Sequence, residues 1–112
     1  MDKIRQIIFY KDYFLDFYND QTAKVKDKIE HVLFVVFDHM TGTDGLYEIR
    51  VEYQGNIYRI FSCFDEGNLV VLFNGFQKKS QKTPTGEIEK ALKIKTEYFI
   101  EKVKSKGHGN KK

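Results

Sequence analysis

The sequence has almost no cysteine with which to stabilise a fold. Cys63 is the single cysteine among 112 residues, and one thiol cannot build a disulfide framework within the chain. Cys63 also has no partner residues at the spacing of a metal site. The cysteine content therefore favours a reducing compartment, and we expect a cytoplasmic protein that needs no metal or other cofactor.

Long hydrophobic runs are missing as well. No apolar stretch reaches the roughly 18 residues of a membrane-spanning helix, and charged residues interrupt the N-terminal segment MDKIRQIIFYKD. We therefore expect neither a signal peptide nor a membrane span. Hydrophobic residues nevertheless make up 41% of the chain and aromatic residues 15%, which is enough for one modest core. We predict a single domain over residues 1–104, followed by a disordered basic tail over 105–112.

Positive charge is concentrated in the last third of the chain. Residues 1–76 contain 8 basic and 12 acidic side chains, whereas residues 77–112 contain 11 basic and 4 acidic ones. A basic segment attached to an acidic body is typical of a surface that binds phosphate groups. The alternative is a lysine-rich exposed helix and tail without any ligand.

Periodicity predicts one strand and two helices in the N-terminal part. The segment from Ile4 to Tyr10 is rich in Ile and Phe and indicates a short buried strand. KDYFLDFYND predicts a short helix, and Asp20 or Thr22 can cap a second one. The apolar stripe of that second helix consists of Val25, Ile29, Val32, Leu33 and Val36. The glycines of TGTDG at 41–45 then break the pattern.

The remaining chain predicts three strands and a last helix. Residues 47–53 alternate apolar and charged side chains, which is typical of a half-buried strand, and turns separate it from strands at 57–64 and 69–76. Thr83 and Pro84 begin a helix, and its apolar side, which we expect to contact the core or a partner, consists of Ile88, Ala91, Leu92, Phe99 and Val103. The predicted order is β-α-α-β-β-β-α, an α+β fold in which a helical hairpin and a C-terminal helix accompany a small, mostly antiparallel sheet.

Arg59 is the only charged residue in the predicted strand at 57–64. A lone arginine in an interior strand has to reach water, a carboxylate or a ligand, because an unpaired buried charge is strongly unfavourable. Arg50 lies on the charged side of the preceding strand, where it can bind phosphate or pair with Glu48 or Glu52. Both arginines are therefore candidate site residues.

A longer pattern joins these pieces. YRIF at 58–61 precedes VVLFNGFQKKSQKTPTGEIEKA at 70–91, and GLYEIRV at 45–51 lies upstream of both. This arrangement resembles the RelE/ParE superfamily of bacterial toxins, and within it the HigB-type, phage-related branch. The positions that carry the resemblance are Arg59, Gly75, Phe76, Lys78, Lys79, Thr83, Pro84, Glu87, Ile88 and Ala91. The likeness covers nearly the whole chain and implies a RelE-like fold.

The resemblance implies a toxin of a toxin-antitoxin system that cleaves messenger RNA on the ribosome. The 2′-hydroxyl would attack the adjacent phosphate, so a base, an acid and fixed positive charge are needed. We assign Arg59 to the scissile phosphate, because its planar fork can donate two hydrogen bonds. Lys78 and Lys79 are the further catalytic candidates, and strand parity allows only one of them to face Arg59. A lowered pKa would let that lysine act as base or acid.

Three further residues are candidates for RNA binding: Arg50, Lys82 and Gln77. Tyr53, Tyr58 and Phe61 could stack on bases, but we interpret most of them as core residues. His31 and His39 carry no metal motif. One departure from the superfamily concerns the end of the last strand, where some members place a histidine, aspartate or tyrosine for proton transfer. This chain has Asn74, Phe76 and Gln77 there.

The resemblance also implies partners. A helix-turn-helix antitoxin would neutralise the protein, either by covering Arg59 and the lysines or by docking on the helices, and only this antitoxin would contact operator DNA. The ribosome and mRNA would be the targets. Two other functions stay open: a ParE-like gyrase poison that does not cut RNA, and a non-catalytic, phage-derived RNA-binding module.

Overall fold

The computed structural model describes residues 6–36, 40–43, 45–66, 69–79 and 84–109. The predicted α+β class is confirmed. In chain order the elements are β1 (Gln6–Phe9), α1 (Tyr13–Asn19), α2 (Ala23–His31), the π-helical turn η1 (Val32–Val36), β2 (Met40–Thr43), β3 (Leu46–Tyr53), β4 (Asn56–Asp65), β5 (Leu69–Lys78) and α3 (Thr85–Gly109).

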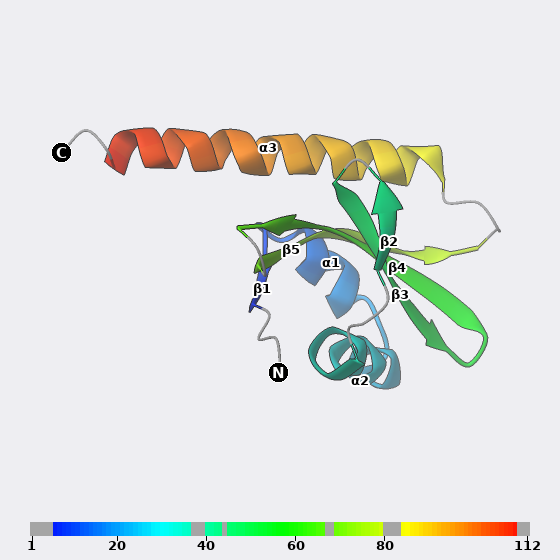
Figure 1. Ribbon diagram of the computed structural model, residues 1–112. Coiled ribbons are helices and arrows are strands. Elements are labelled where there is room, and N and C mark those ends of the chain that lie inside the picture. Colours follow the sequence, from blue (N-terminus) through cyan, green and yellow to red (C-terminus); the bar gives the residue numbers. More distant parts are fainter. Residues whose placement is uncertain (1–5, 37–39, 44, 67–68, 80–83, 110–112) are drawn as a thin grey trace.

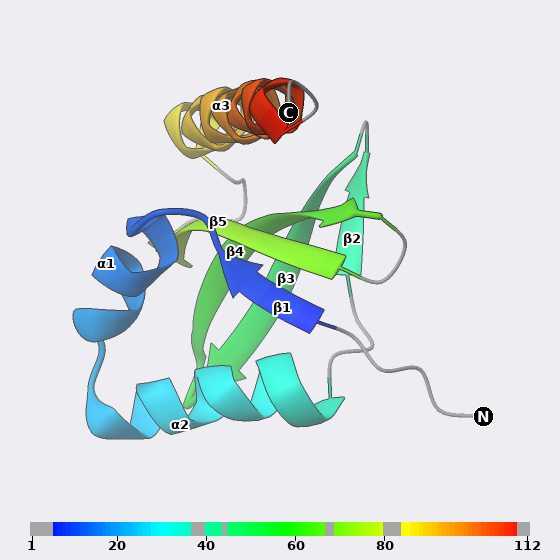
Figure 2. The ribbon, with the colours of Figure 1, turned by 90° about the vertical axis from the view of Figure 1, so that its left-hand side faces the viewer.

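The strands form one mixed sheet. Its order is β1-β5-β4-β3-β2, in which β1 runs parallel to β5 and all other neighbours are antiparallel. Figures 1 and 2 show α3 on one side of this sheet and α1 and α2 on the other. The sheet is therefore the middle layer of the molecule, and its two faces are covered by different parts of the chain.

The strand β2 was not predicted from the sequence. Residues 40–43 pair with β3 in a register that places Thr41 opposite Glu48 and Thr43 opposite Leu46, and Gly45 lies in the connecting turn with φ +80°. The segment is short and contains a glycine, so its own sequence resembles a loop. Its strand conformation depends on hydrogen bonds to β3, which local patterning does not reveal.

One face of the sheet packs against α1 and α2. Their buried side chains and those of β3, β4 and β5 form a continuous apolar cluster that consists of Phe14, Phe17, Val25, Ile29, Leu33, Ile49, Val51, Tyr58, Ile60, Val70 and Leu72. The predicted cap at Thr22 is confirmed, because its hydroxyl accepts a hydrogen bond from the Val25 amide at 3.3 Å. The predicted stripe of α2 also continues into η1, where Leu33 is buried.

The opposite face packs against α3. The second apolar cluster consists of Tyr10, Leu46, Phe61, Cys63, Val71, Phe73, Phe76, Ala91 and Ile94. Polar contacts hold the same helix: Tyr98 donates a hydrogen bond to Asp65 at 2.6 Å, and Lys102 bonds Asp65 and Glu66 at 2.7 Å. These contacts fix α3 along the sheet.

Two features of α3 were not predicted from the sequence. Ile94 and Tyr98 pack on the sheet, whereas Leu92 and Val103, which were expected to contact the core or a partner, are 43% and 69% exposed. The helix also continues to Gly109, beyond residue 104 where the sequence analysis ended the domain. The expected cap Thr83 lies outside the described residues. Pro84 precedes the helix, and its carbonyl oxygen accepts a hydrogen bond from the backbone amide of Glu87 at 3.1 Å.

Candidate nucleic-acid interface

Arg59 lies on β4 between two neighbouring strands. Its register partners are Arg50 on β3 and Phe76 on β5. The side chain is 17% exposed, and its Nε lies 3.7 Å from Oε1 of Glu48. Nε donates no hydrogen bond to any other described residue. Arg59 therefore has a carboxylate close by but keeps donor capacity in a half-buried position.

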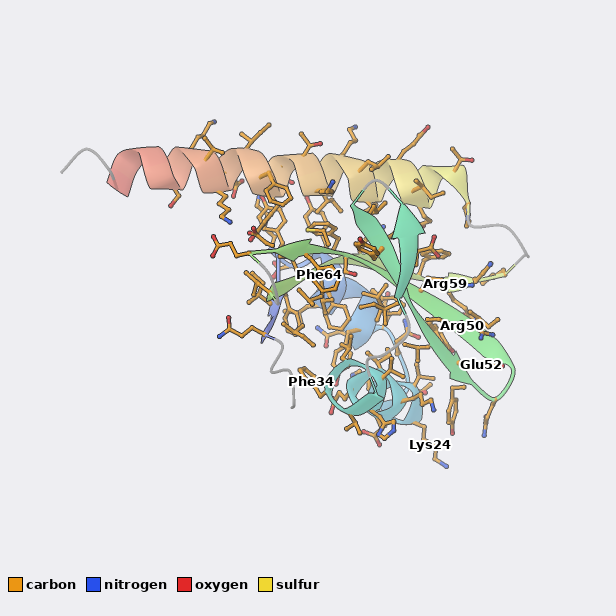
Figure 3. All side chains as sticks on the ribbon, viewed as in Figure 1. Lys24, Phe34, Arg50, Glu52, Arg59 and Phe64 are labelled. Carbon is orange, nitrogen blue, oxygen red and sulfur yellow. The ribbon has the colours of Figure 1, made fainter. Side chains whose placement is uncertain are left out.

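Arg50 lies directly opposite Arg59 on the same face of the sheet. Like charges in this relation are unfavourable, because directly opposed side chains approach closely. Two carboxylates of β3 compensate: Glu48 lies beside Arg59, and Glu52 pairs with Arg50 at 3.1 Å. Figure 3 shows Arg59, Arg50 and Glu52 following one another along the β3–β4 hairpin. Salt bridging of Arg50, which was the alternative to phosphate binding, is thus observed.

The strand register distinguishes the two lysines. Lys78 pairs with Ile57, so its side chain is on the same face as Arg59, diagonally across from it. Lys79 follows the end of β5 and is exposed. Lys82 lies outside the described residues. Of the three lysines, the described geometry brings only Lys78 to the face of the two arginines.

Gln77 does not lie with this group. It pairs with Tyr58, whose side chain belongs to the core beneath α1, and its amide donates to Oδ1 of Asn56 at 3.3 Å. Strand parity therefore directs Gln77 away from Arg59. RNA binding by Gln77 therefore stays a prediction, at a position on the other face of the sheet from Arg59.

The aromatic candidates belong to the two cores. Tyr58 and Phe61 are buried, and Tyr53 packs against the cluster beneath α1 and α2. Phe61 instead stacks on Phe76, with 5.7 Å between ring centroids. Cys63 is also buried, and burial raises the pKa of its thiol to about 11. The interpretation of most of these residues as core is confirmed for Tyr58 and Phe61, whereas Tyr53 is only partly buried.

Glu48 is a further site residue, which the sequence suggested only as a salt-bridge partner of Arg50. Glu48 pairs with Phe61 in the register and directs its carboxylate to Arg59 from the neighbouring strand. Alternation along residues 47–53 placed Glu48 on the face of Arg50, but the pairing with β4 was needed to bring it to Arg59. A carboxylate next to an arginine can accept a proton while its charge is balanced.

A second polar contact lies where β5 faces α3. The register between β4 and β5 shifts between Ile60 and Ser62, which is a β-bulge. Asn74 is 2% exposed, and its amide donates to Oε1 of Glu87 at 3.2 Å. Its Oδ1 has no hydrogen-bond partner among the described residues. The bulge thus turns Asn74 toward the first turn of α3, against the simple alternation of a strand.

The described residues contain no group of three or more His, Cys, Asp and Glu side chains that could hold a metal ion. His31 belongs to the described part of the chain and is exposed, whereas His39 lies outside the described residues. Within the described ranges, no helix is long and apolar enough to cross a membrane.

The fold and the charged hairpin define the class of the protein: a small α+β domain of RelE-like architecture, whose sheet displays cations beside a carboxylate. A comparison with family descriptions identifies the family. Residues 15–96, more than half of the chain, match the family described as phage-derived protein Gp49-like (DUF891). The chain belongs to this family, which is the RelE/HigB-like family of type II toxins. No curated protein gives a significant match.

Proposed function

We propose that the protein is the toxin of a toxin-antitoxin system, of the HigB-type branch, and that it cleaves messenger RNA on the ribosome. The observation that carries the proposal is the pairing of Arg59 with Arg50 across β3 and β4, with Glu48 beside Arg59 and Lys78 on the same face. Family membership supports the toxin class. The resemblance to the HigB-type branch suggests the target, and the charged side chains are compatible with the reaction.

The reaction needs a group that removes the proton of the 2′-hydroxyl. Glu48 fits this role, because a carboxylate is an acceptor and Arg59 balances its charge at 3.7 Å. The 2′-oxygen then bonds to phosphorus, and the bond from phosphorus to the 5′-oxygen breaks. The products are a cyclic phosphate and a 5′-hydroxyl. This assignment replaces the base that the end of β5 lacks.

Negative charge grows on the phosphoryl oxygens during the attack. Arg59 and Arg50, which lie opposite each other, can donate hydrogen bonds to these oxygens from fixed positions. Lys78 lies diagonally across from Arg59 and can supply the proton that the leaving 5′-oxygen takes up. Arg59 and Lys78 are therefore the proposed catalytic residues together with Glu48, and Arg50 binds phosphate.

Further contacts are proposed at the rim of this face. Lys79 is exposed just beyond β5, where it can contact RNA phosphate, and Lys82 is three residues further along the chain. The proposed partners are the ribosome, mRNA and a helix-turn-helix antitoxin, all in the cytoplasm, with operator DNA contacted only by the antitoxin. Each phosphate contact should increase the salt dependence of RNA binding.

The test is primer extension on a reporter mRNA in cells after brief induction. We expect the wild type to produce new 5′ ends only during active translation. Arg59→Ala should remove them, with a loss of roughly 100-fold or more, the scale of losing a group that stabilises transition-state charge. Lys24→Ala is the matched control, because Lys24 is an exposed cation on α2, far from Arg59 in Figure 3.

Three outcomes would contradict the proposal. New 5′ ends that persist in Arg59→Ala, with its fold intact by circular dichroism, would exclude the assigned site. Growth arrest with intact mRNA and stalled gyrase would select the ParE-like function. Absence of arrest in the wild type would select a non-catalytic binding module.

A further inference from the structure

Two consecutive residues of β5 point to the same side of the sheet. Phe73 belongs to the apolar cluster beneath α3, and the amide of Asn74 donates a hydrogen bond to Oε1 of Glu87 on α3 at 3.2 Å. The following Gly75 faces α1, because a Cβ at this position would contact Phe17. Successive residues of a regular strand alternate between the two faces. Phe73 and Asn74 therefore form the β-bulge, and one of them is an extra residue.

The pairing of β4 with β5 shows what this extra residue changes. Ser62 of β4 pairs with Leu72 of β5. In the next pair along the ladder Ile60 lies opposite Gly75, so β4 has one residue between the two pairs and β5 has two. If Asn74 were absent, the strands would pair residue for residue, and every later residue of β5 would keep its present face. A regular ladder therefore needs no residue at position 74.

Asn74 is also unfavourable for stability at this position. The residue is 2% exposed, and its Oδ1 accepts no hydrogen bond from any described residue. A buried polar atom without a partner destabilises the folded state. The strand thus contains a destabilising residue that regular pairing would leave out. Such local conflicts are expected where function requires them, so the surroundings of Asn74 become informative.

The bulge adjoins the face of the sheet that carries Arg59. Phe76, the register partner of Arg59, follows Asn74 by two residues, and Lys78 follows Phe76 by two more. All three side chains of β5 lie on the α3 side, so Asn74 and Lys78 flank the position opposite Arg59. A bulge bends its strand and increases the local twist, which re-aims the side chains beyond it. The bulge therefore influences the direction in which Lys78 extends relative to Arg59.

We propose that Asn74 is a positioning residue of the proposed nuclease site, an inference that rests on the proposed function. The bulge bends β5 beside Arg59, and the hydrogen bond to Glu87 ties the bent strand to the first turn of α3. Asn74 acts through Lys78, which protonates the leaving 5′-oxygen. The rate of cleavage should therefore depend on Asn74, whereas binding to the ribosome should not.

The test is single-turnover cleavage of mRNA on purified ribosomes, measured with the full-length wild type and with a variant in which Asn74 is deleted. We expect the maximal rate of the variant to fall by roughly tenfold to 100-fold, the scale of a small misplacement of a reacting group. The protein concentration for half-maximal rate should change by less than about twofold. Urea unfolding should show an equal or higher midpoint for the variant, because the ladder becomes regular and the unpaired Oδ1 is gone.

Two further variants separate the causes. Asn74→Ala keeps the extra residue but loses the hydrogen bond to Glu87, so its maximal rate should fall by about threefold to tenfold, less than in the deletion. Ser62→Ala is the matched control, because Ser62 is buried beside the same bulge and its Oγ also lacks a partner among the described residues. Ser62 shares the face of Ile60, away from Arg59, so Ser62→Ala should cleave like the wild type.

Different results would overturn this inference and the proposed function. A folded deletion variant that cleaves at the wild-type rate would remove the positioning role and leave the proposed function intact. A change in the half-maximal concentration instead of the maximal rate would assign Asn74 to binding, and equal losses in Ser62→Ala would reduce the effect to general loosening of the strand. If the deletion variant does not fold, wild-type cleavage by Asn74→Ala would overturn the inference. A wild type that leaves mRNA on ribosomes uncut would overturn the proposed function, and this inference with it.

Discussion

The two faces of the sheet differ in how far their helices cover them. Beneath α1 and α2 the inward side chains of the central strands form an apolar cluster that includes Ile49 and Tyr58. On the α3 side coverage decreases along β4, where Phe61 is buried and Arg59 is 17% exposed, and across the sheet to β3, where Arg50 is 48% exposed. On this side the same strands thus contribute to the core at one end and carry charged residues at the other. We call these residues, Arg50, Arg59, Glu48 and Lys78, the charged platform.

This difference explains how charged residues can be held in fixed positions. The backbone of Arg59 pairs with both neighbouring strands, and on the opposite face Val51, Tyr58 and Ile60 are buried beneath α1 and α2. The arginines, Glu48 and Lys78 therefore extend from a rigid sheet and not from a loop. Substitutions on the platform should change activity with little loss of stability, whereas substitutions on the packed face should do the reverse.

Among the residues of the charged face, the largest effect is expected for Glu48→Gln. The amide cannot accept the 2′-hydroxyl proton as a carboxylate does, so cleavage should fall by about 100-fold or more. The free energy of unfolding should fall by about 1–2 kcal/mol, because Glu48 and Arg59 are only 24% and 17% exposed and the amide no longer balances the charge of Arg59. Primer extension and urea unfolding measure the two quantities.

Glu52→Gln is the control for this substitution. Glu52 pairs with Arg50 on the same strand, but its side chain is 54% exposed. If Glu48→Gln and Glu52→Gln cleave equally well while Arg59→Ala is inactive, Glu48 only balances the charge of Arg59 and another group removes the proton.

A smaller effect is expected on the packed face, at Gly75. A Cβ at this position would lie 2.5 Å from Cδ2 of Phe17, closer than packed atoms tolerate. Gly75→Ala should therefore lower the free energy of unfolding by about 1–3 kcal/mol, the usual cost of overpacking. Urea denaturation measures it.

Gly86→Ala is the matched control, because a Cβ there meets no atom within 4 Å and the residue lies in the first turn of α3. It should be neutral or slightly stabilising. Equal unfolding midpoints for Gly75→Ala and Gly86→Ala would show that α1 can move away from the sheet, and that this face is less tightly packed than the structure indicates.

The smallest effect is expected for Tyr98→Phe, on the part of the sheet that α3 covers, and it concerns the pH dependence of stability. Burial and the hydrogen bond to Asp65 raise the pKa of Tyr98 to about 12. Because the folded pKa is raised, this contribution to stability is complete below the unfolded pKa of about 10 and is lost as pH rises toward 12. Between about pH 8 and about pH 11 the melting temperature should fall less steeply with pH in Tyr98→Phe than in the wild type. Thermal unfolding measures it.

Tyr47→Phe is the comparison for the Tyr98 substitution, because Tyr47 lies on β3 against Phe64 and away from Asp65. It should follow the wild-type pH dependence. Identical slopes for wild type, Tyr47→Phe and Tyr98→Phe would mean that the contact between Tyr98 and Asp65 does not persist in solution.

Much of the fold was predictable because local patterns and tertiary packing agree. The alternation at residues 47–53 predicted β3, and the apolar stripe from Val25 to Leu33 predicted α2. The strand β2 was missed because its conformation depends on pairing with β3. For Leu92 and Val103 the sequence left open whether they contact the core or a partner, because the pattern of apolar residues on a helix is the same for both, and the structure leaves both exposed.

For the candidate site, the sequence alone determined which residue types were present: one arginine in a strand otherwise without charge, a second arginine between two glutamates, and lysines after an apolar strand. Tertiary structure decided which of them meet. The register between β3 and β4 brings Arg50 and Glu48 to Arg59, and the register with β5 selects Lys78 and excludes Gln77. The physical reason is that periodicity fixes the face of each side chain within its own strand, whereas the neighbours across the sheet depend on strand pairing, and a shift of one residue would change them all.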